Sequence, residues 1–509
     1  MLLFLPVILL VLTLGALGAS NVQRGFRSSW LLALAGASLA WVSLLFLRFQ
    51  LPLTVNLPFW WAGEGLEYPL IFGLDNFSWP LAFTICSLLV AALLGQVRQA
   101  VMASWVTWAS GLTITSAGLL AAFSGDLLTF LFTWTLLDLL VIALQISGLR
   151  RAEERQHVLQ QVSVLFIGSF VLFAAWIFSF YGQELAAILG FVSVSLRLGL
   201  WTPRPTWSSP PAVRKDLASV ILLVPLAASL ALLVRLEAIA EPGRTTFLLL
   251  ALLPAAYAAG HLLLKADESQ AHLWVLGQAS LAAAAALGGQ GQAALAFSLL
   301  LLLGQGFLPL VQQVPRFRFP ISAAAVVLLC GLPLTAGYLG TGIYANWASP
   351  LILAFLPIQA VLLAGWLRRA LQAPEEPLPA EPWMRTILWL GYATLPLVFI
   401  FLGLGLLPSF AAGDLSLPWW PAVATLAGAA LLYFMFGRSD RQLHPWAQFA
   451  FDWIFSLRWL QVLATSLMGA IAWSLGFLSS LLEGHAGVLW ALLFMALLLS
   501  LAGQYGLGS

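Results

Sequence analysis

The sequence has very little charge. Only 8% of its 509 residues are Asp, Glu, Lys or Arg, whereas soluble domains carry about 25%. Hydrophobic residues make up 61% of the chain, and its mean hydropathy is +0.96. This composition excludes a soluble globular protein and indicates an integral membrane protein with little mass outside the bilayer. The net charge of +2 is small and no basic block is present, so we expect no nucleic-acid partner.

Cysteine is almost absent too. The two cysteines, Cys86 and Cys330, lie in apolar stretches and are expected to be buried packing residues. Neither a metal cluster nor a disulfide framework can be built from them. The sequence also shows no nucleotide-binding loop, no nucleophile–base set and no paired haem histidines. We therefore expect no catalytic site, metal site or cofactor of its own, and whether the chain serves an enzyme complex as a subunit stays open.

Long apolar runs dominate what is present. A helix crosses a bilayer with about 20 apolar residues, and about seventeen such stretches are expected. They cover roughly 2–19, 30–48, 73–95, 103–123, 126–148, 158–181, 184–200, 217–236, 245–264, 272–289, 293–313, 319–346, 348–368, 385–408, 418–436, 458–481 and 486–505. The first run lacks a basic segment before it, so we interpret it as a retained helix and not a signal peptide. The 184–200 run crosses fully or halfway.

Arginines concentrate on every second connection between these runs, which predicts an outside N-terminus and an inside C-terminus. A prokaryotic plasma membrane, or an equivalent energy-coupling membrane, is the expected location. We expect three regions: N-terminal helices and an outer loop (1–70), a core (71–410), and C-terminal helices with a short interfacial segment (411–509).

One carboxylate lies inside an apolar run. Asp138 is in the stretch Asp126–Gln145, which is otherwise suited to cross a bilayer. A charged side chain at membrane depth costs roughly 2.5–3.5 kcal/mol on insertion scales, so it indicates a functional site by default. The alternative is a structural Asp138, neutral or hydrogen-bonded to a neighbouring helix.

Two stretches are expected to interrupt their helices. Pro225 lies inside the 217–236 run, and Gly331-Leu332-Pro333 with Gly337 and Gly340 lies inside the 319–346 run. Irregular backbone at membrane depth requires burial in protein or a polar cavity, and in transporters such breaks often mark the translocation site. Proline kinks that serve only packing are the alternative.

Four short motifs follow one another between about residues 70 and 410. They are Leu74-Asp75-Asn76-Phe77-Ser78, then Gly125-Asp126-Leu127-Leu128 leading to Phe132-Thr133-Trp134, a Trp/Pro-rich turn after Arg197, and Gly331-Leu332-Pro333-Leu334-Thr335-Ala336-Gly337-Tyr338. In order and spacing they resemble the antiporter-like membrane subunits of NADH:quinone oxidoreductases, related hydrogenases and multisubunit cation/proton antiporters.

This resemblance implies an all-α polytopic membrane fold of about fourteen core helices in two inverted repeats with broken helices, here with two or three extra C-terminal helices. It also implies other membrane subunits as partners, besides the lipid bilayer. Relatives pass protons or monovalent cations along buried residues: a glutamate in the fifth helix, lysines in the seventh and eighth, and a lysine or glutamate in the twelfth.

The chain departs from that pattern at most of these positions. The glutamate position holds Thr135, the eighth-helix position falls near Ala227, and the twelfth-helix position holds Thr341. The seventh-helix lysine maps onto Arg197. The eleventh run has Gln305 and Gly306 where relatives carry a histidine and a lysine. Only two lysines occur in the whole sequence, Lys215 and Lys265, and both are expected at the inner rim.

Arginine is a poor proton relay because its guanidinium does not release a proton in proteins. We expect Asp138 to lie on nearly the same helix face as Thr135 and to pair with Arg197 or bind water. Asp126 at the outer end of the same helix, Thr341, and His261 near the inner end of its run complete the candidate ion pathway. Asp75 is expected to be a helix-end or loop carboxylate in water.

Three functions stay open from the sequence. The chain is an ion-translocating subunit of a complex I-like or antiporter-like assembly, or a subunit whose own translocation is weak or lost. The third possibility is a stand-alone secondary transporter for a cation and protons or for inorganic carbon. Co-purifying membrane subunits separate the first two from the third.

Overall fold

The computed structural model describes residues 2–22, 29–58, 69–97, 104–147, 152–200, 217–236, 243–264, 271–312, 318–346, 350–371, 381–406 and 417–436, together with Ser466 and Trp473. The chain divides into two compact units, Met1–Phe455 and Ser456–Ser509. Everything below concerns the first unit. The expected spans 458–481 and 486–505 and the expected interfacial segment lie outside the described residues, apart from those two single positions.

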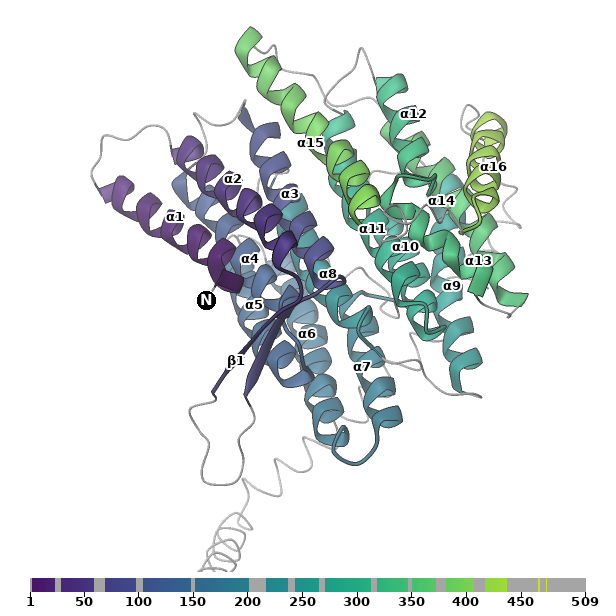
Figure 1. Cartoon of the computed structure of the whole chain (residues 1–509), viewed down its shortest axis with the longest axis horizontal. Helices are drawn as coiled ribbons and strands as arrows, with labels where there is room; N and C mark the ends of the chain where they lie inside the picture. The colour runs from purple at the N-terminus through teal and green to yellow at the C-terminus, as the bar shows by residue number, and fades with distance from the viewer. Residues whose placement is uncertain are drawn as a thin grey trace, which may run out of the picture. The chain divides into compact units, whose positions relative to one another are not determined.

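The described part of the first unit is helical throughout, apart from one hairpin and short turns (Figure 1). The helices are α1 Leu5–Val22, α2 Ser29–Leu47, α3 Ser78–Gly95, α4 Trp105–Ala122, α5 Leu127–Ser147, α6 Ala152–Phe178, α7 Gln183–Arg197, α8 Ala218–Leu233, α9 Gly243–Leu264, α10 Ala271–Leu287, α11 Gly291–Gln312, α12 Arg318–Leu329, α13 Ile343–Asn346, α14 Phe355–Ala370, α15 Pro382–Leu406 and α16 Trp420–Phe436. Short 3₁₀ segments occupy Leu2–Phe4, Arg48–Gln50, Ala336–Gly342 and Pro350–Ala354. Among the described helices, nine are long and apolar enough to cross a membrane. The all-α membrane fold is confirmed.

A two-stranded antiparallel hairpin was not anticipated from the sequence. It consists of β1 Leu53–Leu57 and β2 Leu70–Leu74, with Leu53 opposite Leu74 and Leu57 opposite Leu70. The expected third span was therefore wrong at its start, because 73–74 belong to β2 and the helix begins at Ser78. The strands are short and apolar, so hydropathy could not tell β2 from the first turn of the helix that follows.

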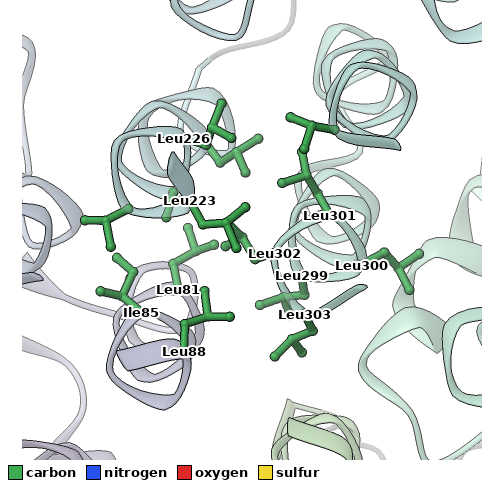
Figure 2. Close-up of a cluster of buried hydrophobic side chains, with 14 of the residues drawn as sticks. Leu81, Ile85, Leu88, Leu223, Leu226, Leu299, Leu300, Leu301, Leu302 and Leu303 are labelled. Carbon is green, nitrogen blue, oxygen red and sulfur yellow. The ribbon is translucent and has the colours of Figure 1, made fainter. Parts of the chain in front are cut away.

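The centre of the unit is formed by α3, α8 and α11, which pack against one another. In the membrane-spanning stretches of α3 and α11, 94% of the residues are buried, compared with 28% in that of α6. Their surroundings are leucine-rich: Figure 2 shows Leu81, Ile85 and Leu88 of α3, Leu223 and Leu226 of α8, and Leu299–Leu303 of α11 gathered in one buried cluster, with Leu300 on the side of α11 away from α3. We call this cluster the leucine wall.

Two helix groups follow the same order, α4 to α8 and α9 to α13, and the fourth helix of each is short. Both short helices end two residues before a glycine with positive φ, Gly199 (71°) after α7 and Gly331 (83°) after α12. Glycine adopts this conformation without steric cost and commonly ends helices. At Gly331 a Cβ would also lie 2.9 Å from the Gly337 carbonyl oxygen.

The break expected at Gly331–Gly340 is confirmed. Helix α12 ends at Leu329, and the chain resumes as a 3₁₀ segment from Ala336. The interruption expected at Pro225 was wrong, because α8 runs unbroken from Ala218 to Leu233. Pro225 removes one backbone donor, but neighbouring helices support the surrounding turns. A proline occurs in both stretches and therefore did not distinguish the interrupted helix from the continuous one. The closely spaced glycines near Gly331 did.

Candidate functional site

The buried Asp138 carboxylate forms a two-pronged ion pair with Arg197. Arg197 Nη1 donates to Asp138 Oδ2 at 2.7 Å, and Nη2 donates to Oδ1 at 2.6 Å. The pair joins α5 to the last residue of α7, so the cation also lies at the negative end of the α7 helix dipole. The Arg197 side chain is 0% exposed and that of Asp138 is 10% exposed. Parallel hydrogen bonds of this kind are the strongest geometry between the two groups.

Neighbouring side chains hold the guanidinium in place. Its central carbon lies 4.1 Å from the ring centroid of Trp134, one turn before Asp138 on α5, in a cation–π contact. On α6, Ser169 Oγ is 3.5 Å from Nη1. Gly168 lets the Arg197 stem pass, because a Cβ there would lie 3.1 Å from Arg197 Cγ. The Ser193 hydroxyl of α7 donates to the Gly168 carbonyl at 2.6 Å and fixes this close approach.

Thr135 does not share the site. It is exposed, and its hydroxyl donates to the Leu131 carbonyl of its own helix at 2.7 Å. Thr135 and Asp138 lie about 60° apart around the helix, and the edge of the buried face falls between them, so Asp138 is buried whereas Thr135 is exposed. Trp134, four residues before Asp138, is the residue that shares its face.

A second ion pair links distant parts of the sequence and was missed. Arg235, just after α8, donates through Nη2 to Asp75 Oδ2 at 3.1 Å. Asp75 precedes α3, outside the membrane-spanning segment, and its Oδ1 accepts from the backbone N–H groups of Phe77 and Ser78 at 2.9 and 2.7 Å. It is a helix-end carboxylate as expected, but it is also paired.

The pKa of Asp75 lies below its usual value. Partial burial raises it, and the Arg235 charge together with hydrogen bonds from Ser78 and Phe77 outweighs that effect. A lowered folded-state pKa stabilises the protein above the unfolded pKa, and this contribution disappears as the pH falls through the folded value.

We therefore expect Asp75→Ala to lower the stability at neutral pH by about 1 kcal/mol, chiefly through the lost cap. Asp75→Asn keeps an acceptor oxygen and should cost less. Thermal unfolding in detergent at pH 7 and below pH ~4 checks this, because the difference between Asp75→Asn and the parent should shrink in acid. A difference that is independent of pH would contradict the assigned charge effect.

The remaining predicted site residues lie apart from the Asp138–Arg197 pair. The Asp126 carboxylate accepts from the Thr129 hydroxyl and starts α5. Thr341 is buried in the 3₁₀ segment after the α12 break, and its hydroxyl donates to the Tyr338 carbonyl at 2.8 Å. His261 is 7% exposed near the end of α9, with its ring centroid 4.3 Å from that of Tyr257. None of these three is hydrogen-bonded to Asp138 or Arg197 in the described part.

The position where the two helix groups meet contains no described charge. Ala227 is fully buried beside the leucine wall. Gly306 allows α11 to approach α3, because a Cβ there would lie 2.2 Å from Leu88 Cδ2. Gln305 is buried but neutral. A lysine at Gly306 would require the Leu88 side chain to move.

Two pairs of buried glutamines join helices elsewhere in the unit. Gln145 donates to Gln161 at 3.0 Å and links α5 to α6, and Gln278 donates to Gln359 at 3.0 Å and links α10 to α14. Both pairs were missed, since single glutamines in apolar runs give no signal of which helix they will meet. Groups of three or more potential metal-ligating side chains are absent among the described residues.

No protein-family model matches the chain. No curated protein matches it either. Solved structures do. A chain of an archaeal membrane-bound sulfane sulfur reductase, a respiratory membrane complex, superposes with a TM-score of 0.66 at 15% identity, covering 98% of this chain and 99% of that one. A chain of the Mrp complex from Dietzia sp. gives 0.67 at 13% identity, covering 99% of this chain and 63% of that one.

The chain has the antiporter-like subunit fold. A subunit of respiratory complex I from Thermus thermophilus agrees, with a TM-score of 0.58 at 20% identity over 80% of this chain and 98% of that one. The resemblance drawn from the four motifs is thereby confirmed at the level of fold. Arg197 is the last residue of the short helix α7, and Thr341 lies in the 3₁₀ segment that follows the short helix α12.

Proposed function

We propose that this chain is a membrane subunit of a complex I-like or Mrp-type assembly whose own ion path is closed. The fold, which matches subunits of such complexes over 80–99% of this chain, supports the assembly role. The leucine wall is the main observation in support of a closed ion path. It fills the contact of α3, α8 and α11, where a relay between the two helix groups would need titratable groups.

The Asp138–Arg197 pair supports the same proposal. A relay group must gain and lose a proton during turnover, and arginine does not do so in proteins. Asp138 is held by both terminal nitrogens of the guanidinium, so its protonation would leave a buried cation without a counterion. The pair then acts as a clamp between α5 and α7, and conduction in the host complex belongs to partner subunits.

Flux measurements on the purified native complex test this role. We expect the double variant Asp138→Leu/Arg197→Met, which removes both charges at similar volume, to assemble and to support unchanged proton- or sodium-coupled flux in sealed vesicles. An uncoupler supplies the zero-flux control. Reduced coupled flux from a normally assembled complex would contradict the closed path.

The purification itself tests the assembly role. An affinity-tagged chain is expected to elute with other membrane subunits in fixed proportion. Ion transport by the chain alone, reconstituted without partners, would instead support a stand-alone transporter.

A further inference from the structure

A cavity of about 220 Å³ lies between the ends of α5, α6, α7 and α8, on the same side as the hairpin. It is partly open and has room for several water molecules, or for a small polar group of similar bulk. The Asp138–Arg197 pair does not line it. Most of the lining is apolar, and the polar part comes from four side chains: Asp126, Ser179, Gln183 and Arg235.

The polar lining lies at the boundary of the hydrophobic spans. Asp126 directly precedes the apolar stretch of α5, Ser179 directly follows that of α6, and Arg235 comes two residues after that of α8. Tyr181, in the turn between α6 and α7, is 83% exposed. Tyrosine is enriched where a chain passes the level of the lipid headgroups. These positions place the cavity at headgroup depth.

One strong donor at the cavity is buried without a hydrogen-bond partner. Arg235 Nη2 donates to Asp75 Oδ2, whereas Arg235 Nη1 is buried and has no partner among the described residues. The Phe130 ring, whose centroid is 6.0 Å from the guanidinium carbon, offers no strong acceptor. Helix α7 begins at Gln183 beside the cavity, without a side-chain cap at Gly182, so the positive end of its dipole also lies there. These features favour an anionic oxygen at Nη1.

A carboxylate oxygen on the opposite part of the lining is free as well. Asp126 Oδ1 accepts from the N–H and the hydroxyl of Thr129, and Oδ2 has no described donor. Asp75, Asp126 and Arg235 together carry one net negative charge, which disfavours a bare anion. The unpartnered Arg235 Nη1 disfavours a bare cation. A ligand that carries both signs, an anionic oxygen beside an ammonium, satisfies the two free groups at once.

We propose that this cavity binds the headgroup of a phospholipid with a primary amine, its phosphate at Arg235 Nη1 and its ammonium at Asp126 Oδ2. Guanidinium–phosphate and ammonium–carboxylate contacts are charge-assisted hydrogen bonds, the stronger class. The bilayer supplies such a zwitterion at the depth where the cavity lies. Only 28% of the spanning residues of α6 are buried, so apolar surface beside the cavity is available to the acyl chains. The inference goes beyond the proposed function, because a lipid binds there whether or not the chain conducts.

Lipid protection of a thiol inside the cavity tests the site. Ala187 lines the cavity from α7, so Ala187→Cys in the detergent-purified complex reports occupancy through its reaction with a neutral maleimide. The parent complex measures the background of all other thiols, including the buried Cys86 and Cys330. At about ten times its Kd, phosphatidylethanolamine should slow labelling about tenfold, because about one site in ten is then empty. Phosphatidylcholine, whose ammonium has no N–H, and phosphatidylglycerol, which has no amine, should bind about tenfold more weakly.

Three variants in the Ala187→Cys background assign the charges. Asp126→Asn keeps the shape and should abolish the preference for the ethanolamine headgroup over the glycerol headgroup. Arg235→Gln should abolish protection by all three lipids. Asp75→Asn is its matched control, because it removes the same salt bridge but keeps the guanidinium, and it should leave the protection in place.

Several results would overturn the proposal. They are equal protection by the three lipids, no protection by any of them, and an ethanolamine preference that persists in Asp126→Asn. Soluble phosphoethanolamine or inorganic phosphate that protects as strongly as the lipid would identify a water-soluble ligand instead. The parent complex supplies an arm without any substitution: phosphatidylethanolamine should raise its unfolding temperature in detergent more than the other two lipids. Equal shifts would contradict the site even where a variant does not fold.

Discussion

Arg197→Met is expected to cost the protein roughly 3–5 kcal/mol of stability, because it leaves the Asp138 carboxylate buried without its cation. Asp138→Leu should cost a similar amount by stranding the guanidinium. The double variant Asp138→Leu/Arg197→Met should recover most of the loss, since well-packed apolar residues often replace a buried pair without penalty. Thermal unfolding in detergent, followed by loss of the monodisperse elution peak, measures all three.

The coupling between the two positions is the decisive quantity. A double variant that loses the sum of the two single losses would show that the residues act independently and would contradict the clamp. The exposed Thr135→Val serves as the matched control on the same helix. Its hydroxyl bonds only to its own backbone, so we expect its stability to stay within ~0.5 kcal/mol of the parent.

Gly306→Lys should be as damaging as either single charge removal. The new Cβ would lie 2.2 Å from Leu88 Cδ2, and overpacking of a core typically costs about 1–3 kcal/mol. The buried ammonium adds the cost of a charge without a described partner in the leucine wall. We expect little folded protein, measured as the yield of complex that elutes with its partner subunits.

Two further variants separate crowding from charge. Gly306→Met brings similar bulk without the ammonium and should lose less stability than Gly306→Lys. Leu88→Ala/Gly306→Met makes room and should regain part of that loss. A Gly306→Lys protein that folds normally would show that the contact between α3 and α11 can open, and it would weaken the case for a closed ion path.

The sequence predicted most of the helices because apolar runs of the right length leave few alternatives in a bilayer. It also singled out Asp138 and named Arg197 as a partner, since each is a rare charge near a known motif of the fold. It could not predict that Trp134 would lie against the guanidinium. Trp134 and Thr135 are adjacent residues of one apolar run and have similar hydropathy. The sequence therefore did not indicate which of the two side chains faces inward.

Other parts of the site depend on tertiary contacts that have no local signal. Arg235 meets Asp75 across 160 positions of sequence, and nothing near either residue indicates the other. The leucine wall is also invisible in advance. In the sequence, α3, α8 and α11 are each an ordinary apolar span. Only their packing in the structure shows that side chains fill the space between the helix groups.

The hairpin has a consequence for how the protein exchanges hydrogen with solvent. The Gly73 N–H donates to the Phe123 carbonyl at 2.6 Å, and the Gly125 N–H donates to the Ile71 carbonyl at 2.7 Å. These two hydrogen bonds hold β2 against the turn between α4 and α5. Loops at a membrane surface usually exchange within seconds, because water reaches their amides freely. These two amides should instead exchange as slowly as those inside the spans, and they make this turn a rigid rim.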